Sequence, residues 1–259
     1  MKKFHMIAGL PRSGSTLLSS ILNQNPRFTA GISDPLNDLI INSIRAFSMA
    51  DLSTQCTEDQ RIHVLRSIIN SYYEKTEIAF NTSRFWTSDL PLMHKLFPES
   101  KVICCVREIG WILDSFERLY NKNSTLYSKH MYGAISQNIH SDVFLRSKDF
   151  LDHENSMMRT YNSLKTAFYG EHNDKLHFVE YNDLATNTEN VMRSIYKFID
   201  EPYFEHDFQN VEMFHDEYDK SAQMNNLHSV RKVVSPNIRN TIVPPEIWET
   251  VKGMEFWRT

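Results

Sequence analysis

A glycine-rich segment near the N-terminus constrains the fold of this chain more than any other feature. The stretch GLPRSGSTLL, residues 9–18, directly follows the apolar run Phe4–Ala8. An apolar run, a glycine turn and then hydroxyl residues predict a buried strand, a phosphate-binding loop and a helix. The unpaired N–H groups at the start of such a helix carry roughly half a positive charge. The sequence therefore predicts a P-loop-like site for a phosphorylated ligand.

This loop lacks the lysine of a nucleoside triphosphatase. Ser15 stands where that lysine belongs, and the nearby cation is Arg12. A guanidinium can bridge two phosphate oxygens with its planar fork, and glycine lets the backbone come close to the anion. The residues that we expect to hold the phosphate are Arg12, Ser13, Gly14, Ser15, Thr16 and Leu17. A plain strand-to-helix turn with a serine cap is the structural alternative.

Two further strand-and-helix units follow along the chain. Residues 100–106 (SKVICCV) are a continuous apolar run, and Trp111–Tyr120 has helical spacing. Lys175–Tyr181 predicts a third strand, which leads through a loop containing Asp183 and Thr186 into a helix ending near residue 199. This alternation predicts an α/β fold of three layers, with a central parallel sheet and helices on both faces. We expect one domain over the whole chain and interpret 120–150 and 200–226 as insertions that line or cover a cleft.

Arg107 ends the second predicted strand, at the edge of a parallel sheet where ligands bind. Triphosphate chemistry uses an acidic residue at such a strand end to hold Mg²⁺. A cation there instead suits a second anionic group, and Ser115 follows within reach of the same anion. We therefore expect a ligand with two separated phosphates and no metal. Gly14 and Tyr181 would fall on the same edge.

Composition excludes several classes of partner. The net charge of −4 gives no overall attraction to nucleic acid or to anionic membranes. No window approaches the roughly 20 apolar residues of a membrane span. Of three cysteines, Cys104 and Cys105 are neighbours, which suits neither a disulfide nor a metal site and favours the reducing cytoplasm. The expected partner is a small-molecule or peptide acceptor, and a homodimer stays open.

Three segments resemble landmarks of the sulfotransferase family. GLPRSGSTLL is similar to the family's 5′-phosphosulfate loop, and VREIGWILDSF (106–116) is similar to its 3′-phosphate motif, an Arg followed eight residues later by a Ser. Val179–Pro202 resembles the third landmark, a Tyr-acidic-Asp-Leu strand end with a helix and an FxxxP close. The Arg-bearing loop resembles the tyrosylprotein branch and its bacterial relatives, for which a peptide tyrosine is a fitting acceptor.

The resemblance implies 3′-phosphoadenosine 5′-phosphosulfate (PAPS) as the sulfonate donor and 3′-phosphoadenosine 5′-phosphate (PAP) as the product. It assigns the 5′-phosphosulfate to residues 12–16, the 3′-phosphate to Arg107 and Ser115, and a place near the adenine to Tyr181. Leu17 occupies a position where some relatives stack an aromatic ring on the base. A second Arg that relatives often have near Gly110 is missing here. We therefore expect C-terminal contacts from LHSVRKVVSP, namely His228, Arg231, Lys232 and Ser235.

The resemblance also suggests which residues act in catalysis. Arg12 would stabilise the charge that develops during transfer. Arg84 lies near the place where relatives carry a catalytic lysine. For the base that takes the acceptor's proton, Asp89 replaces the histidine of the cytosolic relatives, and Asp34 is the acid nearest to the place of the tyrosylprotein glutamate. Two other functions stay open: a nucleotide or small-molecule kinase with the same loop, and a nucleotide-binding module without catalysis.

Overall fold

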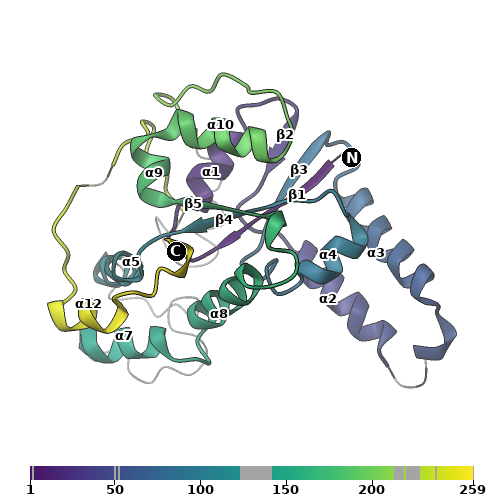
Figure 1. The fold of residues 1–259 in the computed structure, drawn as a ribbon, viewed down its shortest axis with the longest axis horizontal. Coiled ribbons are helices and arrows are strands. Elements are labelled where there is room, and N and C mark those ends of the chain that lie inside the picture. Colours follow the sequence, from purple (N-terminus) through teal and green to yellow (C-terminus); the bar gives the residue numbers. More distant parts are fainter. Residues whose placement is uncertain are drawn as a thin grey trace.

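The fold is built on one five-stranded parallel sheet (Figure 1). The structure is a computed structural model that describes residues 1, 3–49, 51, 53–122, 142–212, 219, 228–236 and 238–258. The strand order is β2-β3-β1-β4-β5, and every neighbouring pair is parallel. The strands are β1 (Lys3–Gly9), β2 (Phe28–Ala30), β3 (Ile78–Thr82), β4 (Val102–Val106) and β5 (Leu176–Glu180).

Helices cover both faces of this sheet (Figure 1). They are α1 (Ser15–Leu22), α2 (Leu36–Phe47), α3 (Glu58–Tyr72), α4 (Leu90–Leu96), α5 (Ile109–Lys122), α7 (Val143–Leu151), α8 (Ser156–Phe168), α9 (Tyr181–Thr186), α10 (Thr188–Phe198) and α12 (Pro245–Val251). Short 3₁₀ turns are formed by Ser53–Gln55, Asn173–Lys175 and Phe256–Arg258. The predicted three-layer α/β fold is confirmed.

Side-chain alternation along the central strand β1 explains the two layers of helices. Phe4, Met6 and Ala8 are buried in a core that includes residues of α2, α3, α4, α5, α8 and α12. Ile7 points to the opposite face, where it belongs to a second core with α1, α9 and α10. Successive strand residues point to opposite faces, so one apolar strand supports both cores. All five residues of β4 are buried as well, which fits a central strand of a parallel sheet.

One local prediction is wrong. Asp183 and Thr186 lie in helix α9 and not in a loop, because the chain turns into a helix immediately after β5. Leu184 and Ala185 on this helix are buried, and Leu184 packs in the core beside α1 and α10. Apolar burial of this short segment therefore outweighs its polar composition. The predicted insertions 120–150 and 200–226 lie partly outside the described residues.

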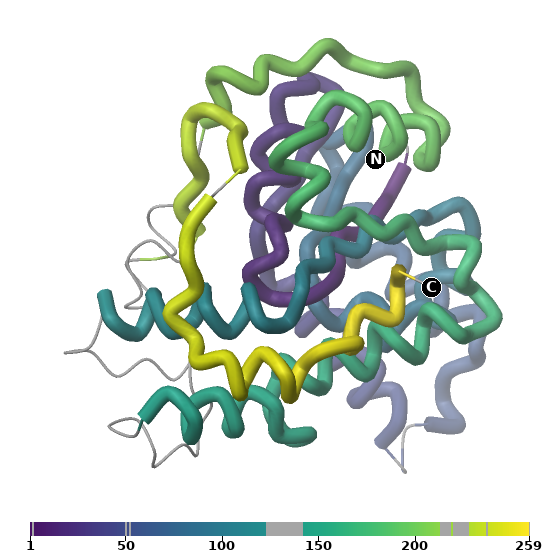
Figure 2. The backbone as a smooth tube through the Cα atoms, turned by 60° about the vertical axis from the view of Figure 1, so that its left-hand side comes forward, coloured from purple at the N-terminus to yellow at the C-terminus, as the bar shows by residue number. Residues whose placement is uncertain are grey.

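The C-terminal part of the chain returns to the edge of the sheet where the strands end. Residues 228–236 and 238–243 pass α1 and then α5 before the chain enters α12 (Figures 1 and 2). Several hydrogen bonds anchor this C-terminal segment. Among them, the Val211 N–H donates to the Lys232 carbonyl at 2.7 Å, and Arg118 Nη2 donates to the Asn240 carbonyl at 2.6 Å. Residues distant in sequence are thereby brought next to the loop after β1.

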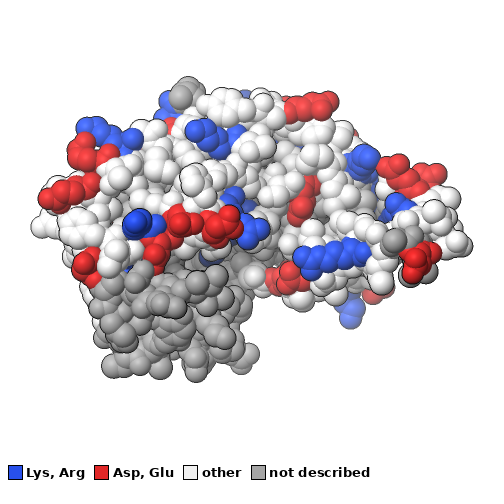
Figure 3. All heavy atoms as spheres, turned by 90° about the horizontal axis from the view of Figure 1, so that it is seen from below, with Lys and Arg blue, Asp and Glu red and all other residues white. Residues whose placement is uncertain are grey.

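The surface carries both signs of charge. In Figure 3, acidic and basic side chains lie interspersed over the face that the view shows. Within the described ranges, no helix has the length and the apolar composition required to cross a membrane.

Candidate active site

The loop between β1 and α1 holds a backbone shape that its glycines permit. Gly9 has φ +113°, and a Cβ there would lie 2.0 Å from the carbonyl oxygen of Cys105 on β4. Gly14 has φ +93° and precedes α1 as its N-cap residue. Glycine adopts such angles without the steric penalty of other residues. No side chain among the described residues caps α1, so its first N–H groups are available to an anion.

Ser13 fixes this loop to the neighbouring strand. Its side chain is fully buried, and its hydroxyl lies against the carbonyl oxygens of Leu10 and Cys105, the latter at 2.8 Å. The hydroxyl is thus engaged inside the protein. Because these contacts engage the hydroxyl, the group that Ser13 can still offer to a phosphate is its backbone N–H.

Arg12 stands at the centre of a group of guanidiniums. Its Nε donates to Ser115 Oγ at 3.0 Å, so the loop and α5 meet here. Burial, followed by the charges of Arg107 and Arg84, lowers the pKa of Arg12 to about 10. Arg84, from the segment after β3, therefore lies near the loop, as its position in the sequence suggested. Repulsion among these cations makes the site favourable for an anion.

Arg107 and Tyr181 form the second half of the site. The guanidinium carbon of Arg107 lies 4.2 Å from the centroid of the Tyr181 ring, and its Nη1 donates to the Arg12 carbonyl at 3.2 Å. A Cβ on Gly14 would lie 2.9 Å from the same tyrosine ring. The structure thus brings together the ends of β1, β4 and β5, as predicted. Burial and then Arg239 lower the pKa of Arg107, while Tyr181 and Asp114 act in the opposite direction.

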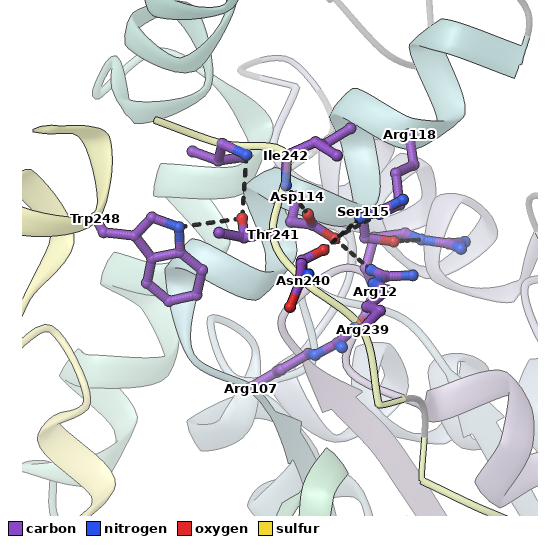
Figure 4. A network of polar contacts seen from close by, with 11 residues as sticks. Arg12, Arg107, Asp114, Ser115, Arg118, Arg239, Asn240, Thr241, Ile242 and Trp248 are labelled. Atoms are coloured by element: carbon purple, nitrogen blue, oxygen red, sulfur yellow. Dashed lines mark hydrogen bonds and ion pairs between the residues drawn. The ribbon is translucent and has the colours of Figure 1, made fainter. Parts of the chain in front are cut away.

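Arg239 also belongs to the site, although it was not identified from the sequence as a site residue. Its Nη2 donates to Asp114 Oδ2 at 2.5 Å, and its guanidinium carbon lies 5.9 Å from the Trp111 ring, with that of Arg107 at 6.0 Å from the same ring. Figure 4 shows Arg239 reaching from the C-terminal segment toward Asp114, beside Arg12. Both Arg107 and Arg239 have a buried Nε without a hydrogen-bond partner among the described residues. Two guanidiniums with unused donors favour a phosphate between them.

Asp114 positions this second arginine. The carboxylate is fully buried and accepts hydrogen bonds from Arg118 Nε at 3.0 Å and from the Ile242 N–H at 2.9 Å. Burial acts to raise the pKa of Asp114, but these hydrogen bonds and the charges of Arg118 and Arg239 together hold it below its usual value. A buried, ionised carboxylate thus ties the C-terminal segment to α5.

The C-terminal candidates occupy different places. His228 is half-buried, and its imidazole lies close enough to Arg12 and Arg84 for both charges to lower its pKa. Arg231 and Lys232 are exposed, and the Lys232 carbonyl accepts a hydrogen bond from the Val211 N–H. Ser235 is half-buried in the same segment. The charges of Arg12 and Arg84 thus connect His228 with the loop.

Asp34 belongs to a polar network under α2. Its Oδ1 accepts from the Leu36 N–H at 2.9 Å, and its Oδ2 accepts from Tyr73 OH at 3.0 Å and Asn81 Nδ2 at 2.5 Å. Asn81 in turn accepts from the Trp86 indole N–H at 2.9 Å. These contacts give Asp34 a structural task at the start of α2.

Asp89 lies at the N-terminus of α4. Burial raises the pKa of its carboxyl, and a hydrogen bond from Asn37 Nδ2 at 3.2 Å partly offsets this effect. Among the described residues, the hydrogen bonds of both acids thus go to partners outside the group around Arg12. Among the described residues, no group of histidine, cysteine, aspartate or glutamate side chains could hold a metal ion.

Comparison with known proteins identifies a family and a fold. A model of the sulfotransferase family matches residues 6–205. The fold is similar to the sulfotransferase domain from the curacin biosynthetic pathway, with a TM-score of 0.54, 14% identity, and coverage of 98% of this chain and 92% of that one. It is also similar to a sulfotransferase from Alicyclobacillus acidocaldarius, with a TM-score of 0.51, 11% identity, and coverage of 86% and 90%. Curated protein sequences give no significant match.

Proposed function

Since this chain belongs to the sulfotransferase family, we propose that it transfers a sulfonate group from PAPS to a hydroxyl or phenol of an acceptor. One observation carries the proposal: two cationic centres lie side by side at the edge of the sheet. The first is the start of α1 with Arg12, and the second is formed by Arg107 and Arg239. PAPS carries its negative charge in two separate groups, which matches two centres better than a single triphosphate chain does.

In this proposal the first centre binds the 5′-phosphosulfate. The N–H groups of Gly14, Ser15 and Thr16 and the hydroxyls of Ser15 and Thr16 donate to it. Leu17 flanks this group at the first turn of α1. The Ser13 side chain holds the loop in shape while its N–H faces the ligand.

The second centre binds the 3′-phosphate. Arg107 and Arg239 supply guanidinium donors, and Ser115 adds its hydroxyl from α5. Tyr181 holds Arg107 in place through its ring and lies where the adenine would follow. The hydrogen bond between Arg12 and Ser115 couples the two centres, because one arginine contacts both.

Transfer is in-line: the acceptor oxygen attacks sulfur while the bond from sulfur to the 5′-phosphate oxygen breaks. Negative charge grows on the leaving oxygen and on the sulfonate. Arg12 and Arg84, together with the helix N-terminus, stabilise this charge, and each such donor is worth about 2 to 4 kcal/mol in the transition state. PAP is the product. The acceptor that we propose is a small molecule or a peptide tyrosine, handled by a single domain over residues 1–259.

Isothermal calorimetry tests the proposal. We expect PAP to bind more tightly than ADP, AMP or ATP with Mg²⁺, and ³⁵S-labelled PAPS to sulfonate members of a panel of phenols, alcohols and tyrosine peptides. Preference for ATP with Mg²⁺ over PAP would refute the proposal in favour of a kinase. Tight PAP binding without transfer to any acceptor would favour a binding module.

A further inference from the structure

A histidine and an aspartate form a close pair beside the cluster of arginines. His228 Nδ1 lies 2.6 Å from Asp219 Oδ1, and the His228 backbone N–H donates to Asp219 Oδ2 at 2.9 Å. The Asp219 side chain is 6% exposed and that of His228 is 14% exposed. Two hydrogen bonds from one residue to both carboxylate oxygens fix the ring relative to the backbone. Such rigidity is what a group that transfers a proton at a defined position requires.

The pair determines which ring nitrogen is basic. An ionised carboxylate can only accept hydrogen bonds, so Nδ1 of His228 must carry the proton that it shares with Asp219. In the neutral ring the lone pair then lies on Nε2. Asp219 thus selects one tautomer and stabilises the ring when it becomes protonated.

Among the described residues, charged groups that act on this ring include Asp219, Arg12 and Arg84. Burial lowers the pKa of His228 first, Asp219 partly offsets the effect, and both arginines lower the pKa further. Asp219 in turn acts on Arg12, whose pKa its charge raises. The pair therefore lies within electrostatic range of the centre that, by the proposed function, holds the sulfonate. At neutral pH the ring is mostly neutral and able to accept a proton.

We propose that His228 is the general base of the transfer reaction and that Asp219 is its positioning residue. This inference rests on the proposed function and assigns the proton transfer to the C-terminal segment instead of to Asp34 or Asp89. Asp34 accepts hydrogen bonds from three groups, which engage both of its carboxylate oxygens in the network under α2. Asp89 is likewise engaged elsewhere, because its carboxylate accepts a hydrogen bond from Asn37 Nδ2.

The step balances without any further reactant. The acceptor O–H gives its proton to His228 Nε2 as its oxygen forms the bond to sulfur. The electron pair of the breaking bond between sulfur and oxygen stays on the 5′-phosphate of PAP. The imidazolium, stabilised by Asp219, later releases its proton to water.

The experiment compares His228→Gln with the wild-type chain and with His177→Gln as a matched control. His177 is a half-buried histidine in β5 that contacts Ser194, away from the cluster. The assay is ³⁵S transfer from PAPS to two phenols: an ordinary alkyl phenol, and pentafluorophenol, which is already ionised at neutral pH. PAP affinity is measured for each variant by calorimetry.

We expect His228→Gln to lower kcat for the alkyl phenol by about 10²- to 10⁴-fold, the usual contribution of a general base. The loss should be far smaller for pentafluorophenol, because a phenolate needs no base. PAP affinity should change less than threefold, and His177→Gln should behave as wild type. In wild type the rate should fall as the pH drops through the lowered pKa of His228.

Asp219→Asn provides a second readout. Removing the negative charge lowers the pKa of His228 further, so the acid limb of the pH-rate profile should move to lower pH while kcat falls. Equal losses on both phenols, or a defect confined to PAP affinity, would overturn the role of His228 and return it to structure or PAPS binding. If wild type sulfonates no acceptor at all, the proposed function fails, which is a different outcome from normal transfer by His228→Gln.

Discussion

Arg107→Ala provides the sharpest test of the proposal that separate parts of the site bind the two anionic groups of PAP. Arg107 is 8% exposed, so a phosphate bound to it is largely removed from water. Truncating one partner of a buried, hydrogen-bonded charge pair costs about 2 to 5 kcal/mol. At 1.4 kcal/mol for each tenfold change, PAP should bind about 30- to 4,000-fold more weakly.

The ligand without a 3′-phosphate supplies the contrast. AMP lacks the group that Arg107 would hold. The affinity of Arg107→Ala for AMP should therefore fall only because the loop loses one stabilising contact, the hydrogen bond from Arg107 to the Arg12 carbonyl at 3.2 Å. A neutral acceptor of this kind is worth about 1 kcal/mol, or roughly a fivefold change. Arg107→Lys should fall between wild type and Arg107→Ala, because lysine keeps the charge but not the planar fork.

Calorimetry with PAP and AMP on all variants measures both effects. Arg193→Ala is the control, since Arg193 is an exposed arginine of α10 that pairs with Glu189. Thermal unfolding checks that each variant is folded. Equal losses of affinity for PAP and AMP would refute the assignment of Arg107 to the 3′-phosphate, whatever their size.

Four further outcomes are expected. Arg239→Ala should weaken PAP at least tenfold in calorimetry while leaving AMP nearly unchanged, because in the proposed function this arginine binds the 3′-phosphate that AMP lacks; unchanged PAP affinity would exclude Arg239 from the 3′-phosphate site. Gly110→Ala should lower the free energy of unfolding in urea by about 1 to 3 kcal/mol, because a Cβ there would lie 2.3 Å from the Trp248 ring, whereas Gly31→Ala, with no atom within 4 Å, is the neutral control. Ser13→Ala should cost about 1 to 3 kcal/mol by leaving the Leu10 and Cys105 carbonyls without their hydroxyl, and it should weaken PAP as the loop loosens; a stable variant with normal affinity would contradict the role given to this serine. The pKa of Asp114 is lowered in the folded state, so its contribution to stability is present above pH of about 4 and is lost as the pH falls through the lowered value; Asp114→Asn should flatten this part of the curve of unfolding free energy against pH.

The sequence predicted the parts of the site that local patterns encode. Strand β1, its glycine loop and Arg107 at the end of β4 all follow from short apolar runs with polar residues at their ends. Since the carboxyl ends of parallel strands meet at one edge, the position of Arg107 and Tyr181 on the same edge was predicted too, and there the two side chains are in contact. Local patterns are sufficient wherever the fold itself brings strand ends together.

Other features depend on contacts that no local pattern reveals. Arg239 is a single cation in a polar stretch, and its contact with Asp114, 125 residues distant in the sequence, helps to hold it in the site. The prediction named C-terminal contacts at 228–235 and did not include Arg239, which lies four to eleven residues further on. His228 was expected to bind PAPS, and only its pairing with the buried Asp219 suggests a different use. The helix α9 was missed because two apolar residues in six are too few for a periodic signal.

The hydrogen bond of Arg118 to Asn240 and the return of the C-terminal segment along α5 have a consequence for synthesis in the cell. The sheet can form once β5 has left the ribosome, but Arg239 joins the site only after the segment beyond residue 238 has been made. A nascent chain halted before residue 228 would therefore hold a complete sheet and an incomplete form of the proposed nucleotide site. The proposed site is thus completed later in synthesis than the sheet that supports it.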